Sequence, residues 1–186
     1  MTQKKVKAGD VLVAQPFMID PHFRRTAVLL VEHGEEGSLG FVMNRPLPEV
    51  RVDGLVADFP EFEAGVSYGG PVQQDTLHYL HNVGDLLDGS RKVSDGVWWG
   101  GDFDKLKFLI GNELIRPAHI RFFVGYAGWA PGQLEEELAY GSWVVADMDA
   151  NYMFRLKPRT LWKRILEDKG GNYGVIAQMP LTPSWN

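Results

Sequence analysis

The feature that most constrains the fold is an uninterrupted apolar run, AVLLV, at residues 27–31. A second apolar run, LGFVM at residues 39–43, follows after the loop sequence Gly34-Glu35-Glu36-Gly37. Two short runs of this kind around a glycine-containing loop predict a β-hairpin with a loop of about four residues. Because AVLLV does not alternate with polar residues, we expect its strand to be covered on both faces.

Further apolar runs predict additional strands, which we place at residues 11–14, 66–68, 76–81, 97–99, 120–126 and 143–146. Apolar spacings of three and four predict helices over residues 103–114, 131–140 and 159–168. In the second helix, Pro131 suits the first helical position, and Gln133 can return a hydrogen bond to the cap. The pattern predicts a mixed α and β class, and the length suits one domain over residues 1–186.

Composition excludes several classes of protein. The chain contains no cysteine, which excludes thiol nucleophiles, disulfides, zinc fingers and iron–sulfur clusters and fits a reducing compartment. The amino-terminal sequence MTQKKVKAGD is basic but lacks the apolar run of a signal peptide. The longest uncharged stretch, residues 122–134, is shorter than the roughly 20 residues of a membrane span. We therefore expect a cytoplasmic protein without a membrane partner.

Glu32 and His33 stand where the hairpin enters its loop. His33 could act as a general base because its ordinary pKa lies near neutrality. Glu32 is not a suitable carboxylate partner, since neighbours on a strand point to opposite faces. No serine lies in a G-x-S-x-G turn that would present a nucleophile. The alternative is a surface histidine that helps to close a tight loop.

Asn44-Arg45-Pro46 ends the second strand of the hairpin, far from the loop. Antiparallel pairing places Asn44 near Ala27, so Arg45 should lie close to Arg24, Arg25 and the Asp20-Pro21 turn and about 20 Å from His33. One interpretation is a buried structural pair between Arg45 and Asp20. The other is a pocket for an anionic ligand, because a guanidinium group recognises carboxylate or phosphate. The candidate ligand-binding residues are Asp20, Arg24, Arg25, Asn44 and Arg45.

The segment from Gly125 to Leu134 runs from a predicted strand through a glycine-rich turn into a predicted helix. Such a turn can hold phosphate on free backbone N–H groups. Its glycine spacing matches neither common phosphate-binding motif, and residues 135–137 are all glutamate. Tight packing of strand and helix around Trp129 is the favoured interpretation.

Two other groups of residues invite a functional hypothesis. His78 and His81 could share a metal on a helix, but their segment favours a strand, which separates them. The basic stretch from Arg155 to Arg164 could contact nucleic acid or could be the solvated face of a helix. The net charge of −5 does not favour a nucleic-acid-binding protein.

Three blocks of sequence together carry a resemblance to a known family. They are LVAQPFMIDPHFRRTAVLLVEHGEEGSLGFVMNRP (Leu12–Pro46), GGPV (Gly69–Val72) and GYAGWAPGQLEEEL (Gly125–Leu138). In this order and spacing they closely resemble the AlgH/YqgE family of largely uncharacterised bacterial proteins. The resemblance implies an α+β fold: a single compact domain with a mixed, bifurcated β-sheet that partly closes into a small barrel, flanked by helices.

The resemblance implies little about activity. One branch of the family carries a transcriptional-regulator label from alginate control, yet this sequence has no helix-turn-helix signal and no net basic charge to support it. The family has no agreed catalytic residues and implies no cofactor or metal. Its motif positions predict a second candidate surface made of Glu32, His33, Gly69, Gly70, Gly128, Trp129 and Gln133.

We therefore predict a domain for binding or regulation, because no nucleophile, base and orienting group can be assembled from these residues. One alternative is an enzyme or binding protein for an anionic small molecule, with a pocket centred on Arg45. Another is a regulator that binds nucleic acid through residues 155–164. A protein partner would need an exposed apolar patch, for which Trp98-Trp99 or Trp185 is a candidate.

Overall fold

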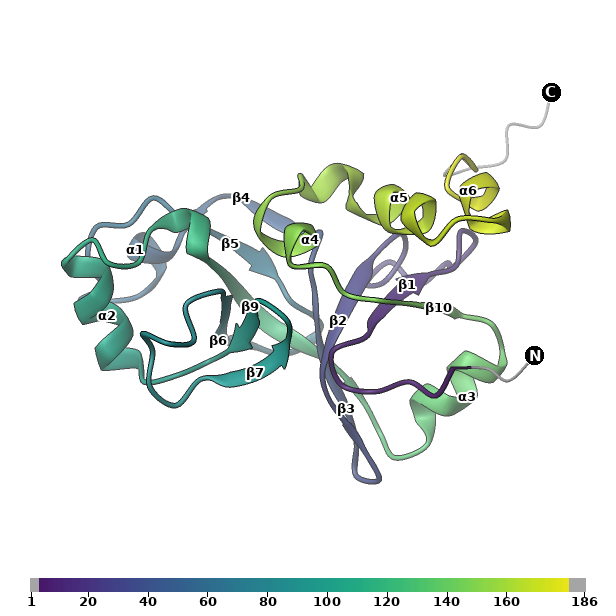
Figure 1. Cartoon of the computed structure of the whole chain (residues 1–186), viewed down its shortest axis with the longest axis horizontal. Coiled ribbons are helices and arrows are strands. Elements are labelled where there is room, and N and C mark those ends of the chain that lie inside the picture. The colour runs from purple at the N-terminus through teal and green to yellow at the C-terminus, as the bar shows by residue number, and fades with distance from the viewer. Residues whose placement is uncertain (1–3, 181–186) are drawn as a thin grey trace.

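The computed structural model describes residues 4–180, in which a ten-stranded mixed sheet is surrounded by helices (Figure 1). The strands are β1 (Val11–Ala14), β2 (Ala27–Gly34), β3 (Gly37–Val42), β4 (Pro46–Arg51), β5 (Gly65–Tyr68), β6 (Val72–His81), β7 (Arg91–Ser94), β8 (Val97–Trp99), β9 (Ile120–Trp129) and β10 (Trp143–Ala146). The helices are α1 (Val52–Leu55), α2 (Phe103–Gly111), α3 (Gln133–Ala139), α4 (Ala150–Phe154), α5 (Pro158–Lys169) and α6 (Asn172–Ile176), and a 3-10 turn spans Pro117–His119.

The sheet divides at β9. The strand order is β10-β1-β2-β3-β9-β6-β8-β7, and β9 pairs with β3 near its end and with β5 near its start. The β5–β9 pairing is parallel and the other pairings are antiparallel, so the mixed, bifurcated sheet is confirmed.

The expected closure into a small barrel is wrong, because the end strands β10 and β7 do not pair with each other in residues 4–180. An α5 side chain meets the end strand β10: Lys169 Nζ donates a hydrogen bond of 2.7 Å to the carbonyl of Val145.

The hairpin of β2 and β3 confirms the prediction from the AVLLV run. Residues 27–31 are at most 1% exposed, because β2 is covered on both faces by separate apolar clusters. The loop is shorter than expected: Gly34 pairs with Gly37, so Glu35 and Glu36 alone make the turn. Gly37 has φ of 118°, a conformation that glycine adopts at little cost and that permits so tight a turn.

Most of the other predicted elements are confirmed, with shifts at their ends. Strands β1, β8 and β10 have the predicted bounds, whereas β6 and β9 are longer. Helix α2 ends at Gly111 rather than residue 114. Helix α3 begins at Gln133 because Gly132 has φ of 79°, so Pro131 precedes the helix instead of opening it. The bond expected from Gln133 is present: its Oε1 accepts from the backbone N–H of Ala130 at 3.0 Å.

The core consists of three apolar clusters that divide the molecule into regions. One cluster lies between β1, β2 and helix α5, and another lies around α2, β5 and β9. The third contains Val6, Trp129, Leu134 and Trp143 and joins the amino-terminal segment to α3 and β10. Among the helices of residues 4–180, none has both the length and the apolar composition needed to cross a bilayer.

Candidate functional site

A cleft of about 600 Å³ opens beside the outer edge of β10, and we call it the N-terminal cleft. The amino-terminal segment, the end of β2, helix α3 and the junction of α5 and α6 supply its other walls. Its apolar lining is Val6, Leu138, Trp143, Val144, Val145 and Tyr173. Its ionisable lining is Lys4, Lys5, His33, Glu135 and Lys169. The cleft therefore offers an apolar surface together with several cations.

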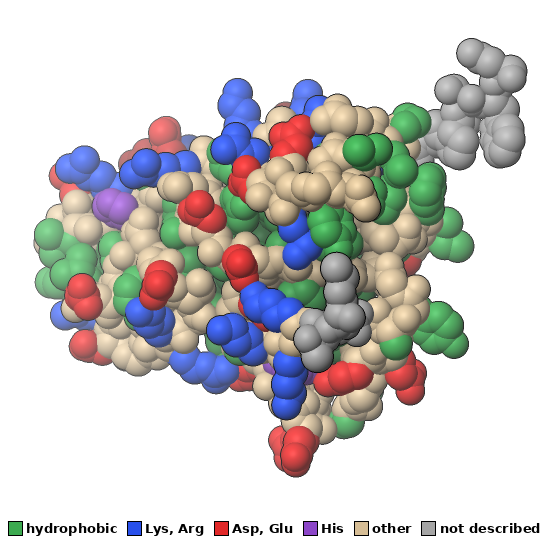
Figure 2. Space-filling model, turned by 45° about the vertical axis from the view of Figure 1, so that its right-hand side comes forward, with side chains coloured by type: hydrophobic (Ala, Val, Ile, Leu, Met, Phe, Trp, Pro, Cys, Tyr) green, Lys and Arg blue, Asp and Glu red, His purple; other side chains and the backbone are tan. Residues whose placement is uncertain are grey.

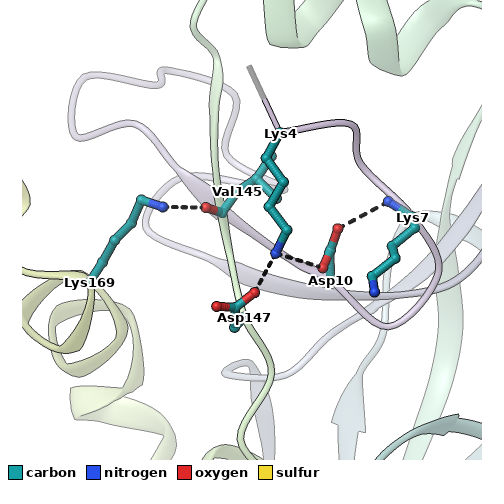
Figure 3. A network of polar contacts seen from close by, with 6 residues as sticks. All are labelled: Lys4, Lys7, Asp10, Val145, Asp147 and Lys169. Atoms are coloured by element: carbon teal, nitrogen blue, oxygen red, sulfur yellow. Dashed lines mark hydrogen bonds and ion pairs between the residues drawn. The ribbon is translucent and has the colours of Figure 1, made fainter. Parts of the chain in front are cut away.

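The amino-terminal segment is held over the end of the sheet by a buried carboxylate. Asp10 is 3% exposed, and its Oδ2 accepts a hydrogen bond of 3.0 Å from the backbone N–H of Lys7. Lys4 Nζ lies 3.5 Å from Asp10 Oδ1 and also pairs with Asp147, as Figure 3 shows. Val6, between these lysines, is 6% exposed and packs in the cluster of Leu134 and Trp143. These contacts make residues 4–7 a fixed wall of the cleft.

The charges around this wall influence one another. The hydrogen bond from Lys4 holds the pKa of Asp147 below its ordinary value, and Lys169 and Lys7 lower it further. The same bond raises the pKa of Lys4. In residues 4–180, neither Lys5 nor Lys169 has a carboxylate within 4.0 Å. On the face shown in Figure 2, basic side chains gather at the lower centre with acidic side chains between them.

His33 lies at the edge of the cleft between two polar partners. Its Nδ1 is 2.7 Å from the hydroxyl of Ser38, which faces it across the β2–β3 hairpin. Its Nε2 is 3.5 Å from Glu135 Oε1, which α3 supplies. His33 and Glu135 also line a second cleft of about 600 Å³, which shares Lys5 and Val6 with the first. Glu32 does not serve His33, as expected, because it pairs with Arg91 at 2.9 Å.

A serine, a histidine and a glutamate in contact suggest nucleophilic catalysis, but the geometry favours binding. Ser38 is not among the residues that line either cleft, so a ligand held there would meet His33 and Glu135 and not the hydroxyl. The 3.5 Å separation of His33 and Glu135 also exceeds the length of a good hydrogen bond. The pair can exchange hydrogen bonds with a ligand.

The hairpin register places Asn44 where the sequence predicted it. Its Oδ1 accepts from the backbone N–H of Ala27 at 3.1 Å, and its Nδ2 donates to the carbonyl of Arg25 at 2.9 Å. The interpretation of Arg45 and Asp20 as a buried structural pair is wrong. Asp20 is exposed and accepts from the backbone N–H of His22 at 2.9 Å, whereas Arg45 is half-buried and donates to the carbonyl of Arg24.

The arginines of the predicted anion pocket point to different partners. Arg25 has φ of 53°, and its Cζ lies 4.3 Å from the centre of the Trp162 ring on α5. Its Nη2 donates to the carbonyl of Met179, and burial lowers its pKa. Arg24 is exposed and contributes its carbonyl to Arg45. The structure thus brings Arg24 and Arg45 together and directs Arg25 toward α5.

Of the remaining motif residues, Gly69 and Gly70 serve close packing. A Cβ on Gly69 would lie 2.3 Å from the carbonyl oxygen of Gly125, and one on Gly70 would lie 2.1 Å from the carbonyl carbon of Tyr126. These glycines therefore let the β5–β6 connection contact the backbone of β9. Gly128 is exposed on β9.

The turn before α3 also serves packing. Trp129 Nε1 donates to Glu137 Oε2 at 2.8 Å, and Trp143 Nε1 donates to the same oxygen at 2.8 Å. Gln133 already accepts the N–H of Ala130, a donor that a phosphate would need. Strand–helix packing explains this glycine-rich segment.

The structure also shows where the two histidines of β6 and the basic stretch of residues 155–164 lie. His81 is fully buried, and His78 lies on β6 among the rings of Phe41, Trp99 and Tyr126. No group of three possible metal ligands occurs in the described part of the chain. On α5 the basic face is partly neutralised, since Lys163 and Arg164 lie 3.8 Å and 2.9 Å from acidic groups one turn later.

The candidate apolar patch at Trp98 and Trp99 is covered by cations. Both rings are partly buried, with Lys92 Nζ 5.8 Å from the ring of Trp98 and Arg91 Cζ 5.3 Å from the ring of Trp99. Trp185 lies outside the described residues.

A family model described as AlgH-like matches residues 11–174. This chain belongs to the AlgH-like family. The AlgH-like chain is 42% identical over 183 residues to a UPF0301 protein of Chlorobium phaeobacteroides, with 98% of this chain and 97% of the relative covered. It is 43% identical over 182 residues to a UPF0301 protein of Chlorobium limicola, with 98% and 97% covered.

Two solved structures resemble this AlgH-like chain. The solution structure of the AlgH protein from Pseudomonas aeruginosa has a TM-score of 0.73 and 30% identity, with 97% of this chain and 98% of that chain covered. A crystal structure from Corynebacterium diphtheriae has a TM-score of 0.79 at 22% identity, with 96% and 95% covered, and shows the same fold.

Sequence reasoning about this AlgH-like protein missed most of the N-terminal cleft. Lys5, Val6, Leu138, Lys169 and Tyr173 come from segments with no shared spacing, so no motif could group them. The available signal was the basic sequence KKVK at residues 4–7, in which one apolar residue stands among lysines. His33 is the predicted site residue that lines the cleft.

Proposed function

We propose that this AlgH-like protein is a non-catalytic small-molecule-binding domain whose ligand lies in the N-terminal cleft. The observation that carries the proposal is the lining of the cleft, where apolar side chains stand beside Lys5 and Lys169, neither of which has a carboxylate within 4.0 Å in residues 4–180. Concave, largely apolar sites with a few convergent polar groups are typical of ligand pockets, and about 600 Å³ lies in their usual size range.

Two other functions receive less support. A hydrolase would need its nucleophile within reach of the bound substrate, and Ser38 does not line the cleft. A nucleic-acid regulator would need cations free to contact phosphates, and two basic groups of α5 are already paired along the helix.

The proposal is tested by filling the cleft. In Val144→Trp, a large side chain replaces one of the lining residues of β10. Native and denaturing mass spectrometry of freshly purified protein should show a retained mass in the wild type that is lost in this variant. The control is Val175→Trp, the same change on α6 at a side chain that is 67% exposed and does not line the cleft.

A second filling variant, Leu138→Trp on α3, keeps the test decisive if Val144→Trp fails to fold. A retained mass that persists in a folded filling variant would contradict the proposal. If the wild type retains no mass, a fragment screen by ligand-observed NMR replaces the retained ligand. Fragments that bind the wild type and both filling variants equally would also contradict it.

A further inference from the structure

We propose that the ligand of the N-terminal cleft is an amphipathic organic anion, with an apolar body and a carboxylate, sulfonate or phosphate head group. This inference rests on the proposed function and adds the chemical class of the ligand. In this arrangement the apolar body lies along β10 and α3, and the head group lies between Lys5 and Lys169.

The apolar half of the site is built into the core. Val6 and Trp143 are each 6% exposed, and both belong to the cluster that joins the amino-terminal segment to α3. Trp143 is further fixed by the bond from its indole N–H to Glu137. Leu138 and Val144 are partly exposed beside them, so they offer apolar surface to a ligand. Burial of such surface supplies affinity with little selectivity.

The cationic half supplies the selectivity. Lys169 Nζ donates to the carbonyl of Val145 at 2.7 Å and lies 5.1 Å from the ring centre of Tyr173. An ammonium group has three donors, so two of them remain for a ligand. Lys4 differs from Lys5 and Lys169, because Asp10 and Asp147 already compensate its charge.

Lys5 and Lys169 are exposed, and a neutral ligand lying against them would remove some of their water without pairing their charges, which is unfavourable. An anionic head group would pair with both through charge-assisted hydrogen bonds. The cleft therefore discriminates between ligands that differ in charge alone.

Among the lining residues within 4–180, Glu135 is the one carboxylate, and its side chain is 55% exposed. It repels an anion, while its neighbour His33 lies 3.5 Å away and reduces this repulsion when protonated. Neutralising Glu135 should therefore strengthen the binding of an anion, whereas neutralising Lys5 or Lys169 should weaken it. The opposite effects of these variants on the affinity for an anion follow from their charges and do not depend on apolar contacts.

The test uses two fluorescent probes with the same kind of ring system. 8-Anilino-1-naphthalenesulfonate carries a sulfonate, and N-phenyl-1-naphthylamine is neutral. We expect the sulfonate probe to bind the wild type at least ~10-fold more tightly, and its affinity to fall between about 0.05 M and 0.5 M NaCl because salt screens the lysines. The affinity of the neutral probe should not fall.

Variants assign the effect to the cleft. Each of Lys5→Gln and Lys169→Gln should weaken binding of the sulfonate probe by about 3-fold, and the double variant by about 10-fold, as expected for exposed charges. Glu135→Gln should strengthen it by a similar factor of about 3. Lys105→Gln, on α2, is the matched control and should leave both probes unchanged. Unfolding curves confirm that each variant is folded.

Three other outcomes would overturn the inference, and they differ in what they say about the proposed function. In the first outcome, both probes bind with equal affinity, Val144→Trp abolishes their binding, and the lysine variants do not change it. The cleft would then bind ligands without selecting anions. If neither probe binds, the proposed function fails as well. If Lys105→Gln weakens the sulfonate probe as much as Lys5→Gln does, the probe binds the general surface and not this site.

Discussion

At the scale of single residues, His81 shows how a polar side chain can be structural. It is fully buried on β6. Its Nδ1 accepts from the backbone N–H of Val83 at 3.3 Å, and its Nε2 lies 2.8 Å from the carbonyl of Gly100, to which it donates. Both bonds require the neutral ring with its proton on Nε2. Burial lowers the pKa of His81 from its ordinary 6.5, because the charged form cannot be solvated there.

We expect this histidine to make folding stability depend on pH. Its pKa is lower in the folded state than in the unfolded state, so its contribution is complete above about pH 6.5 and is lost as the pH falls below that value. Urea unfolding at pH 7.5 and pH 5.5 should show a loss of stability in acid that is smaller in His81→Gln. An equal loss in both proteins would contradict the prediction.

Gly70 is a motif position whose role is steric. It has φ of 156°, and an added Cβ would lie 2.1 Å from the backbone of Tyr126. Gly70→Ala should destabilise the fold by roughly 3 kcal/mol or more, since the backbone of β9 cannot move away cheaply. Gly111→Ala, on α2 with open space around it, should stabilise the fold by roughly 0.5–1 kcal/mol. Thermal unfolding measures the change in stability of both variants, and equal changes would contradict the steric role of Gly70.

At the scale of elements, the sequence predicts those strands and helices whose formation depends on a local residue pattern. The β2–β3 hairpin needs residues 27–42 alone, and its register then places Asn44 beside Ala27. β4 was not predicted, because it contains Pro46 and Pro48 and pairs with β5 at an irregular register. β7 is a short end strand with two exposed charged residues, so its sequence carries little strand pattern. Backbone conformation also shifted the end of a predicted element: at Gly132, φ of 79° delays the start of α3 to Gln133.

One carboxylate joins three of these elements. Glu137 on α3 accepts the indole N–H groups of Trp129 on β9 and Trp143 on β10, both rings being 6% exposed. Glu137→Ala leaves both donors without an acceptor and should cost roughly 2–4 kcal/mol. Glu136→Ala, at an exposed neighbour, should change stability by less than about 0.5 kcal/mol. Denaturant unfolding measures both, and a loss in Glu137→Ala no larger than that in Glu136→Ala would refute the link.

At the scale of the whole molecule, the cleft depends on contacts that no local pattern encodes. Its walls come from residues 4–6, from 135–145 and from 169–173, with His33 between them. Sequence reasoning placed Arg24, Arg25 and Arg45 near one another through the hairpin register. It could not predict that Trp162, far along the chain, attracts the guanidinium of Arg25 away from Arg45. Side-chain direction is set by tertiary packing.

The amino-terminal wall should detach when its buried carboxylate is removed. Asp10→Ala takes away the acceptor of the Lys7 N–H and one partner of Lys4, and it should cost roughly 1–3 kcal/mol. Hydrogen exchange at the Lys7 amide should accelerate at the same time. Asp147→Ala also removes an ion pair of Lys4, but the Asp147 side chain is 87% exposed. We therefore expect this variant to lose less than about 1 kcal/mol of stability. Unchanged exchange at Lys7 in Asp10→Ala would rule out this anchoring role.

The pairing of β1 with β10 has a consequence for biosynthesis. Val11 lies opposite Ala146, so two strands that are synthesised far apart in time must pair. Such pairings of high sequence separation fold slowly, because a long loop must close before the contact forms. While the ribosome is still adding residues 143–173, the walls of the cleft that come from β10 and from the junction of α5 and α6 are incomplete. We therefore expect the proposed ligand to bind only after these walls have formed, so that occupancy would mark molecules that have completed their fold.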